Sequence, residues 1–287
     1  MEKDAFSRYH PAVNFVYFLG AIGFAVVIAH PVYLLAGLVC ACGYYLLLTG
    51  RRGWKLLTGL IPVFLIITLC NPLINTRGDT VLFSWLDRPY TLEALCYGGA
   101  LGAMFVLMML WFGCYNLVLT SDKFVCLFGS LIPSLSLLLV MVLRLIPGFM
   151  RQTDKISAAR ASIGKGGHNG SLRQKAASGV TILSALTDWA LEGSIVTADS
   201  MRSRGYGTAR RTSYRIYRMT VRDGLLLALE LLLALTVALG GPSAAFVPSI
   251  TISPLTWQFG AYCVFLLIPI ILAWKEAVQW RILRSSI

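Results

Sequence analysis

The chain has 287 residues, of which 57% are hydrophobic and only 13% are charged, and its mean hydropathy is +0.71. About a quarter of the residues in an ordinary soluble domain are charged, so this composition excludes a soluble globular protein. The net charge of +12 could indicate nucleic-acid binding, but Lys and Arg also accumulate in the cytoplasmic loops of membrane proteins. Because several apolar runs approach the roughly 20 residues that cross a bilayer, we expect an all-α polytopic membrane protein.

Four apolar runs occupy the N-terminal part of the chain, and each predicts a membrane-spanning helix: residues 12–29, 32–49, 56–74 and 92–120. Arg51, Arg52 and Lys55 lie in a compact basic loop, which we place in the cytoplasm. Residues 75–91 are polar with balanced charge, as expected of an outside loop. The small residues of the fourth run predict a face for close helix packing, and they are Gly98, Gly99, Gly102 and Ala103.

Residues 124–149 are apolar enough to span, but a span there would carry a strongly basic segment to the outside. That segment, residues 151–222, holds thirteen Lys and Arg against four acids, so an outside location would violate the positive-inside tendency. Several residues also interrupt the apolar run: Pro133, Ser134, Ser136, Arg144 and Pro147. We therefore predict that residues 124–149 form a helical hairpin or an in-plane, partly inserted helix, which keeps the basic segment cytoplasmic.

Helical periodicity predicts an amphipathic helix over residues 149–163 and a longer helix over residues 172–204. Glycines follow both helices, at positions 164 and 205, and are expected to stop them. Two further spans, residues 225–239 and 257–274, bring the expected total to six. The expected domains are N-terminal transmembrane helices (1–123), a coupling domain (124–222) and C-terminal transmembrane helices (223–287).

Two short motifs in the basic segment share one design. Ala159-Arg160-Ala161 and Ser203-Arg204-Gly205 each place an arginine among small residues near a helix end. A cation near a helix C-terminus complements the helix dipole, which is the simpler interpretation of each arginine taken alone. The pairing favours another one, in which a guanidinium clear of bulky neighbours inserts its planar fork into an acidic groove of another protein.

With these motifs, the chain resembles the transmembrane T subunit of energy-coupling-factor (ECF) vitamin and metal transporters, which are relatives of the cobalt-transport membrane subunit. The resemblance covers nearly the whole chain and includes His10-Pro11 and Arg144-Leu145-Ile146-Pro147. The family carries two Ala-Arg-Gly-like motifs on cytoplasmic coupling helices. The chain departs from that pattern at Ala161, where Gly is common, and at Ser203, where Ala is common.

The resemblance implies a non-catalytic scaffold in a prokaryotic cell membrane, with two P-loop ATPase subunits and a small membrane substrate-binding (S) subunit as partners. The residues expected to contact the ATPases are Ala159, Arg160, Ala161, Ser203, Arg204 and Gly205. Those expected to contact the S subunit are Leu138, Met141, Arg144 and Pro147. The S subunit determines the substrate in this family, so the implied cargo is a vitamin or a metal ion.

Other polar residues offer weaker candidates. Gly164 to Ser171 lacks the GxxxxGK[ST] register of a P-loop, so we expect no ATP or other cofactor on this chain. Arg144, at membrane depth, is either functional or a snorkelling residue. Asp188 and Glu192 share a helical face and are expected to form a salt bridge with Arg173, Lys175 or a coupling-helix arginine. Glu230 could pair with Arg222 or a neighbouring helix. The three His and seven Cys show no metal-site spacing, so we expect no metal site.

Two alternative functions remain. A polytopic membrane enzyme could act on lipid or prenyl substrates and use the basic segment to hold an anionic head group. It would need clustered acids or an acid–base pair, for which the sequence offers only Asp188 with Glu192. Binding of nucleic acid by the basic segment is weaker still, because the segment lacks regularly interleaved aromatic residues.

Overall fold

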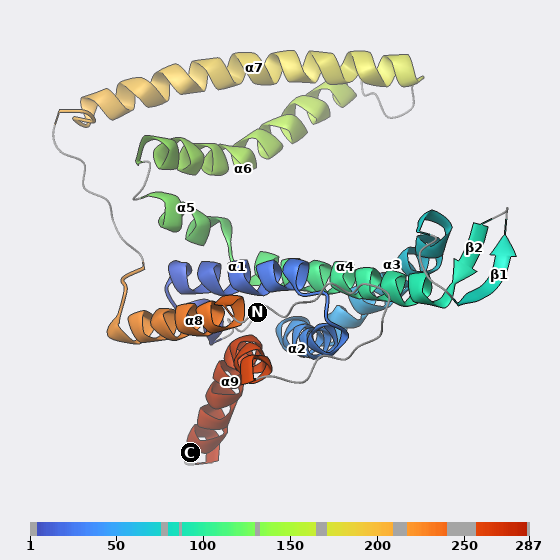
Figure 1. The fold of residues 1–287 in the computed structure, drawn as a ribbon. Helices are drawn as coiled ribbons and strands as arrows, with labels where there is room; N and C mark the ends of the chain where they lie inside the picture. Colours follow the sequence, from blue (N-terminus) through green and yellow to red (C-terminus); the bar gives the residue numbers. More distant parts are fainter. Residues whose placement is uncertain are drawn as a thin grey trace. The chain divides into compact units, whose positions relative to one another are not determined.

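The computed structural model describes residues 5–75, 80–85, 88–129, 133–164, 171–208, 217–239 and 257–285. Its helices are η1 (Phe6–Arg8), α1 (Pro11–Val27), α2 (Pro31–Thr49), η2 (Gly50–Gly53), α3 (Trp54–Ile74), α4 (Leu92–Val118), α5 (Ser121–Gly129), α6 (Pro133–Ser162), α7 (Leu172–Ser203), α8 (Val221–Leu239) and α9 (Trp257–Ser285) (Figure 1). Two short strands, β1 (Val81–Trp85) and β2 (Arg88–Thr91), complete the described elements. The expected α-helical membrane class is confirmed.

Each of the six apolar runs expected to span coincides with a helix: α1, α2, α3, α4, α8 and α9. By length and composition, three helical segments in the described part of the chain could cross a membrane: Pro31–Ile74, Leu92–Val118 and Trp257–Glu276. The first of these contains α2, η2 and α3, and α1 is a shorter apolar helix. The number of crossings, six, stays a prediction.

Contacts divide the chain into two units. Unit 1 contains Met1–Phe124 and Tyr217–Ile287, and unit 2 contains Val125–Ile216. The chain therefore leaves unit 1 after Phe124 and re-enters it at Tyr217. The expected coupling domain, residues 124–222, overlaps unit 2, but the contacts assign its last six residues to unit 1.

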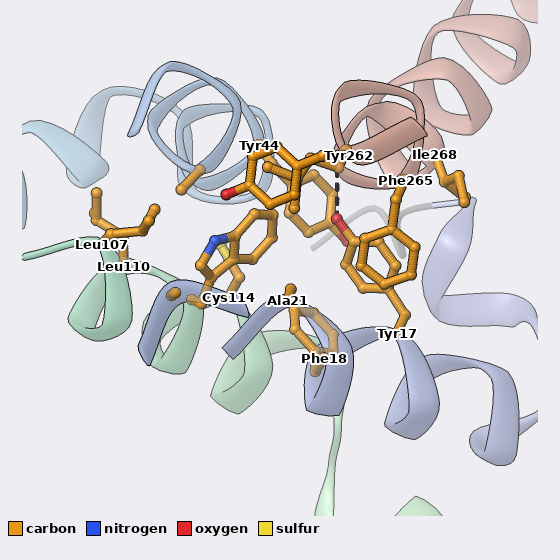
Figure 2. Close-up of a cluster of buried hydrophobic side chains, with 14 of the residues drawn as sticks. Tyr17, Phe18, Ala21, Tyr44, Leu107, Leu110, Cys114, Tyr262, Phe265 and Ile268 are labelled. Atoms are coloured by element: carbon orange, nitrogen blue, oxygen red, sulfur yellow. Dashed lines mark hydrogen bonds between the residues drawn. The ribbon is translucent and has the colours of Figure 1, made fainter. Parts of the chain in front are cut away.

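The helices of unit 1 pack around a core rich in aromatic side chains. Helix α4 contacts α1, α2 and α3, while α8 contacts α1 and α9, and α9 also contacts α2. Tyr17 of α1 is fully buried, stacks on Phe265 of α9 at a centroid distance of 5.1 Å, and donates a hydrogen bond to the carbonyl of Leu266 at 3.1 Å. Figure 2 shows this cluster, in which α1, α2, α4 and α9 each contribute side chains. Residues distant in the sequence thus form one hydrophobic core.

The predicted small-residue face of α4 is confirmed at two positions. A Cβ atom at Gly98 would lie 2.7 Å from Asn71 Cβ and 2.8 Å from the carbonyl oxygen of Thr68, both in α3. A Cβ at Gly102 would lie 3.1 Å from Phe64 Cδ2. Helices α3 and α4 approach this closely because no side chain separates them there.

Residues 75–91, the expected outside loop, include an antiparallel β-hairpin among their described residues. Val81 pairs with Thr91, and Trp85 pairs with Arg88. The apolar and aromatic residues of VLFSW favour a strand. The hydroxyl of Tyr90 donates to the carbonyl of Leu69 at 3.1 Å, so the hairpin is attached to α3.

Arg144 and Pro147 interrupt the apolar run, but they do not end a helix. Helix α6 runs without a break from Pro133 to Ser162 and contains both residues. Figure 1 shows α6 with a bend along its length. We attribute the bend to Pro147, which lies inside α6, since proline removes one backbone hydrogen bond and kinks a helix. The apolar run 124–149 is thus divided between α5 and α6.

Some predictions fall on residues outside the described ranges. They concern most of the stretch from Gly164 to Ser171, where no P-loop is expected, and part of the basic segment 151–222.

Candidate functional site

The two helices that carry the arginine motifs, α6 and α7, pack against each other in an antiparallel arrangement. Phe149 of α6 and Trp189 of α7 form an edge-to-face pair with centroids 5.6 Å apart. Closer to the end of α6, Arg160 Nη2 donates to Ser178 Oγ of α7 at 3.4 Å. Phe149 and Arg160 are eleven residues apart in α6, and their partners Trp189 and Ser178 are eleven residues apart in α7. Eleven residues make about three helical turns, so both contacts lie on the same face of each helix. One face of α6 therefore contacts one face of α7 over this length.

Arg160 lies in the last turn of α6 and is partly buried. Its Nε atom is buried and has no hydrogen-bond partner among the described residues. Ala159 and Ala161, on either side, are exposed. The guanidinium of Arg160 thus lies against α7, where it contacts the small side chain of Ser178.

Helix α7 ends in a Schellman motif, and this confirms the predicted stop at Gly205. The residue has a φ of +78°, its N–H donates to the carbonyl of Arg202 at 2.9 Å, and the N–H of Tyr206 donates to the carbonyl of Met201 at 3.0 Å. Arg204 is the C-cap and is exposed. Ser203 is also exposed, and its hydroxyl donates to the carbonyl of Ser200. The motif Ser203-Arg204-Gly205 is therefore presented on the surface of the described chain.

Helix α6 also stops at a left-handed glycine, which is Gly164 with a φ of +75° and an N–H that donates to the carbonyl of Ala161 at 3.0 Å. Arg160 precedes this glycine by four residues, whereas Arg204 immediately precedes Gly205. Two motifs of similar sequence thus hold their arginines differently. One guanidinium lies along the neighbouring helix, and the other extends from a helix end.

A large part of the apolar surface of α7 is uncovered. None of the residues of α7, all of which are described, is buried. Most of its exposed apolar side chains recur at helical spacing, and six of them are between 60% and 86% exposed: Leu172, Val180, Leu183, Leu191, Ile195 and Val196. A soluble helix would bury such a stripe, so this face is suited to a contact outside the described chain.

The residues expected to meet an S subunit all lie in α6. Leu138 is 58% exposed, Arg144 and Pro147 are exposed, and Met141 is partly buried. They share one continuous helix, because α6 does not end at Pro147.

The expected ion pairs of this region are not formed among the described residues. Asp188 and Glu192 are exposed and have no cation within 4.0 Å in that part of the chain. Glu230 of α8 is completely buried, and neither of its carboxylate oxygens has a hydrogen-bond partner there. The described chain contains no group of three or more His, Cys, Asp or Glu side chains that could hold a metal ion.

Two buried charged residues close to the borders of the units were missed by the sequence reasoning. Lys123 is 4% exposed and Asp223 is 6% exposed. Thr220-x-x-Asp223 matches a helix N-cap pattern and could have indicated the role of Asp223 at the start of α8. Lys123 gives no such signal, because its partners are distant in the sequence or on the backbone.

Comparison with known proteins gives consistent matches. Residues 4–214 match the family described as cobalt transport protein, CbiQ. The energy-coupling factor transporter transmembrane protein EcfT of Staphylococcus aureus is 30% identical over 196 residues, which cover 63% of this chain and 73% of that protein. The EcfT protein of Listeria innocua is 28% identical over 251 residues, covering 79% of this chain and 94% of that protein.

A third EcfT protein, from Brevibacillus brevis, is 26% identical over 195 residues, covering 63% of this chain and 74% of that protein. The family match extends through both arginine motifs, and the helices expected from the resemblance are present. The chain therefore belongs to the cobalt transport protein family, CbiQ, together with the EcfT transmembrane proteins of energy-coupling factor transporters.

Proposed function

We propose that this chain is the scaffold subunit of an ECF-type importer, which joins two ATPase subunits to a membrane substrate-binding subunit. ATP-driven closure of the ATPases moves α6 and α7, and these helices pass the motion to the substrate-binding subunit. The cargo is a vitamin or a metal ion bound by that subunit. Hydrolysis of ATP takes place on the partner chains, and this chain performs no catalysis.

The observation that carries this proposal is the uncovered surface of α7. A helix of 32 residues with no buried residue gains little stability from its own chain, since helices in proteins are stabilised mainly by packing of an apolar face. Its apolar stripe indicates a protein or lipid contact, and its exposed C-cap arginine indicates an acidic partner. These two features on one helix are those of an element that joins a membrane partner to a soluble one.

Arg204 is the stronger of the two candidates for contact with an ATPase. Its guanidinium offers five donors in a planar fork, and the Schellman motif fixes the backbone from which it extends. Arg160 offers fewer free donors, because Nη2 already contacts Ser178. Arg160 would have to leave α7 to enter an acidic groove, so its engagement is coupled to the packing of α6 on α7.

On the membrane side, the proposal assigns contact with the substrate-binding subunit to Leu138, Met141, Arg144 and Pro147. All four lie in the part of α6 that precedes its contacts with α7 at Phe149 and Arg160. The same helix would then carry the substrate-binding contact in its first half and the ATPase contact at its end.

The proposed location is the cell membrane of a prokaryote, with the basic segment, residues 151–222, on the cytoplasmic side. The charge balance supports this orientation, because thirteen of the 25 Lys and Arg fall in residues 151–222. ATPase subunits would be accessible there.

The proposal is tested by affinity purification of the tagged chain from native membranes. The wild-type chain is expected to recover one or two P-loop ATPases and a small hydrophobic protein. Arg160→Glu with Arg204→Glu is expected to insert normally and lose the ATPases, since each fork is replaced by a carboxylate that faces like charge.

Arg151→Glu with Arg202→Glu is the matched control, because it makes the same charge change at exposed positions of the same two helices. It is expected to retain the ATPases. Equal loss in both double variants would show that bulk charge, not the motifs, holds the partners. Recovery of a folded wild-type chain without any ATPase would contradict the proposal itself.

A further inference from the structure

The chain crosses from one unit to the other twice, and we call the stretch at each crossing a passage. A buried charged residue lies close to each passage. Lys123 immediately precedes Phe124, the last residue of unit 1 before the chain enters unit 2. Asp223 follows Tyr217, where the chain returns, by six residues. Burial of a charge is costly unless hydrogen bonds compensate for it, so the partners of both side chains indicate what these positions do.

The Lys123 ammonium is held by oxygens from two parts of unit 1. Nζ lies 2.9 Å from the carbonyl oxygen of Val118, at the end of α4. It also donates to the carbonyl and to the hydroxyl of Ser7, the latter at 2.9 Å. The side-chain amide of Asn14, oriented so that both of its ends find a partner, accepts from Nζ at 3.0 Å and donates to the carbonyl of Phe6 at 2.9 Å. Lys123 therefore attaches the first passage to the N-terminal segment.

The Asp223 carboxylate attaches the second passage to the same segment. Its Oδ2 accepts from the N–H and the hydroxyl of Thr220, at 2.8 and 2.7 Å, which caps α8. Its Oδ1 accepts from the N–H of His10 at 3.2 Å. Since His10 is also the N-cap of α1, the carboxylate lies at the N-termini of two helices, where negative charge is favoured.

The segment that receives both side chains is itself anchored in unit 1. Phe6 is fully buried and contacts the rings of Tyr17 and Phe18, with centroids 5.1 and 6.3 Å away. Arg8 forms an ion pair with Glu276 of α9 at 2.6 Å. Residues 6–10, which we call the N-terminal clasp, thus contact α1 and α9 as well as both passages.

We propose that Lys123 and Asp223 are positioning residues that join the two passages through the N-terminal clasp, so that motion of unit 2 enters unit 1 at one joint and not at two independent ones. The inference rests on the proposed function, because it concerns how motion of the coupling helices reaches the membrane helices. Without the clasp, each passage could move alone, and ATP-driven motion of unit 2 would be lost before it reached α1, α4, α8 and α9.

The first test asks whether the two passages are linked, and it needs only the purified chain in detergent. Hydrogen exchange is measured at the amides of Lys123 and Phe124 on one passage and of Thr220 and Gly224 on the other. The amides of Lys123, Phe124 and Gly224 donate to backbone carbonyls, and the amide of Thr220 donates to the carboxylate of Asp223. Lys123→Met is expected to raise exchange at the remote Thr220 and Gly224 amides by about fivefold or more, and Asp223→Asn to do so at Lys123 and Phe124.

Lys55→Met and Asp122→Asn are the matched controls, since both change exposed charges of unit 1 in the same way. They are expected to leave the remote amides unchanged. If Lys123→Met proves too damaging for a folded sample, Ser7→Ala removes a single acceptor and should give a smaller rise at the same remote amides. Faster exchange confined to the mutated passage would overturn the proposal.

The second test uses the complex purified with its ATPases and asks whether the joint transmits motion. Addition of ATP to the wild-type complex is expected to change the exchange of unit 1 peptides. The Lys123→Met and Asp223→Asn complexes should retain the ATPases and hydrolyse ATP, but lose most of that change, while Lys123→Arg should restore part of it. If ATP changes the exchange of unit 1 peptides in both variants as much as in the wild type, the proposal of a joint is overturned. Failure of the wild-type chain to bring down ATPases would instead contradict the proposed function.

Discussion

Arg160 of α6 donates a hydrogen bond to Ser178 of α7, whereas Arg204, its counterpart in the second motif, is exposed at the C-cap of α7. The two arginines should therefore respond differently to removal. Arg160 contributes to the packing of the two helices on each other, and Arg204 makes no comparable contribution. This asymmetry leads to the first prediction.

Arg160→Ala is expected to loosen the contact between α6 and α7, and Arg204→Ala is not. A long hydrogen bond of this kind contributes about 0.5 kcal/mol to about 1 kcal/mol, and the lost packing of the arginine stem adds to it. Hydrogen exchange of α7 amides around Ser178 measures the effect. Arg151→Ala, an exposed arginine of the same helix, is the control. Equal protection in all three variants would show that the Arg160–Ser178 contact does not stabilise the pair.

The second prediction concerns Gly205, whose φ of +78° is required by the Schellman motif. Gly205→Ala should destabilise the end of α7 by about 1 kcal/mol, because a Cβ atom is disfavoured in the left-handed region. Gly193→Ala is a matched control in the interior of the same helix, where a Cβ meets nothing within 4 Å. That substitution should stabilise α7 by roughly 0.5 kcal/mol to roughly 1 kcal/mol. Exchange rates of the last turn of α7 distinguish the two, and the same sign for both changes would contradict the assignment.

The third prediction tests the close approach of α3 and α4. Gly98→Ala should lower the melting temperature in detergent, since the added methyl would lie 2.8 Å from the backbone oxygen of Thr68. Overpacking of this kind costs about 1 kcal/mol to about 3 kcal/mol. Gly99→Ala, one residue along, meets only the methyl group of Thr68 at 3.9 Å and should be tolerated. Similar melting temperatures for the two variants would show that α3 and α4 separate easily.

Local patterns predicted much of this fold correctly. Apolar runs located the corresponding helices to within a few residues, except that α9 continues to Ser285, beyond the expected end at residue 274, and glycines marked the ends of α6 and α7. Both signals depend on neighbouring residues alone. The continuity of α6 through Pro147 does not, since a proline in a helix ends it or bends it according to what compensates for the lost hydrogen bond.

The candidate site was predicted in position but not in geometry. The sequence places Arg160 and Arg204 near helix ends, and the structure agrees. Which way a guanidinium points depends on the neighbouring helix, and Ser178 is eighteen residues away in the chain. Ser7 and His10, the partners of Lys123 and Asp223 near the N-terminus, are separated from them by 116 and 213 residues, a distance at which periodicity and spacing carry no information.

The fourth prediction is a pH dependence that arises from Asp223, which lies before the apolar stretch of α8. Burial alone would raise the pKa of this carboxyl, but hydrogen bonds from Thr220 and from the N–H of His10 outweigh it, so the pKa falls below its ordinary value of 3.8. A depressed pKa stabilises the fold above the pKa of the unfolded chain, and that stability is lost as the pH falls through the folded value. The melting temperature of the wild-type chain should thus drop below about pH 4. Asp223→Asn should be less stable at neutral pH and show a shallower drop, while an identical pH profile would contradict this role.

The fifth prediction concerns Glu230, which is fully buried in α8 without a hydrogen-bond partner for either carboxylate oxygen in the described chain. An unpaired buried polar group costs about 1 kcal/mol to about 3 kcal/mol, so Glu230→Met, which has a similar volume, should raise the melting temperature in detergent. Leu229→Met, at the adjacent and 45% exposed position, is the control and should have little effect. A destabilising buried group is kept where function needs it. The ATP-dependent change in hydrogen exchange of unit 1 peptides in the purified complex should therefore be smaller in Glu230→Met than in the control. A variant that is less stable than the wild type would show that the carboxyl has a partner in unit 1, and an unchanged ATP response would show that transport does not require it.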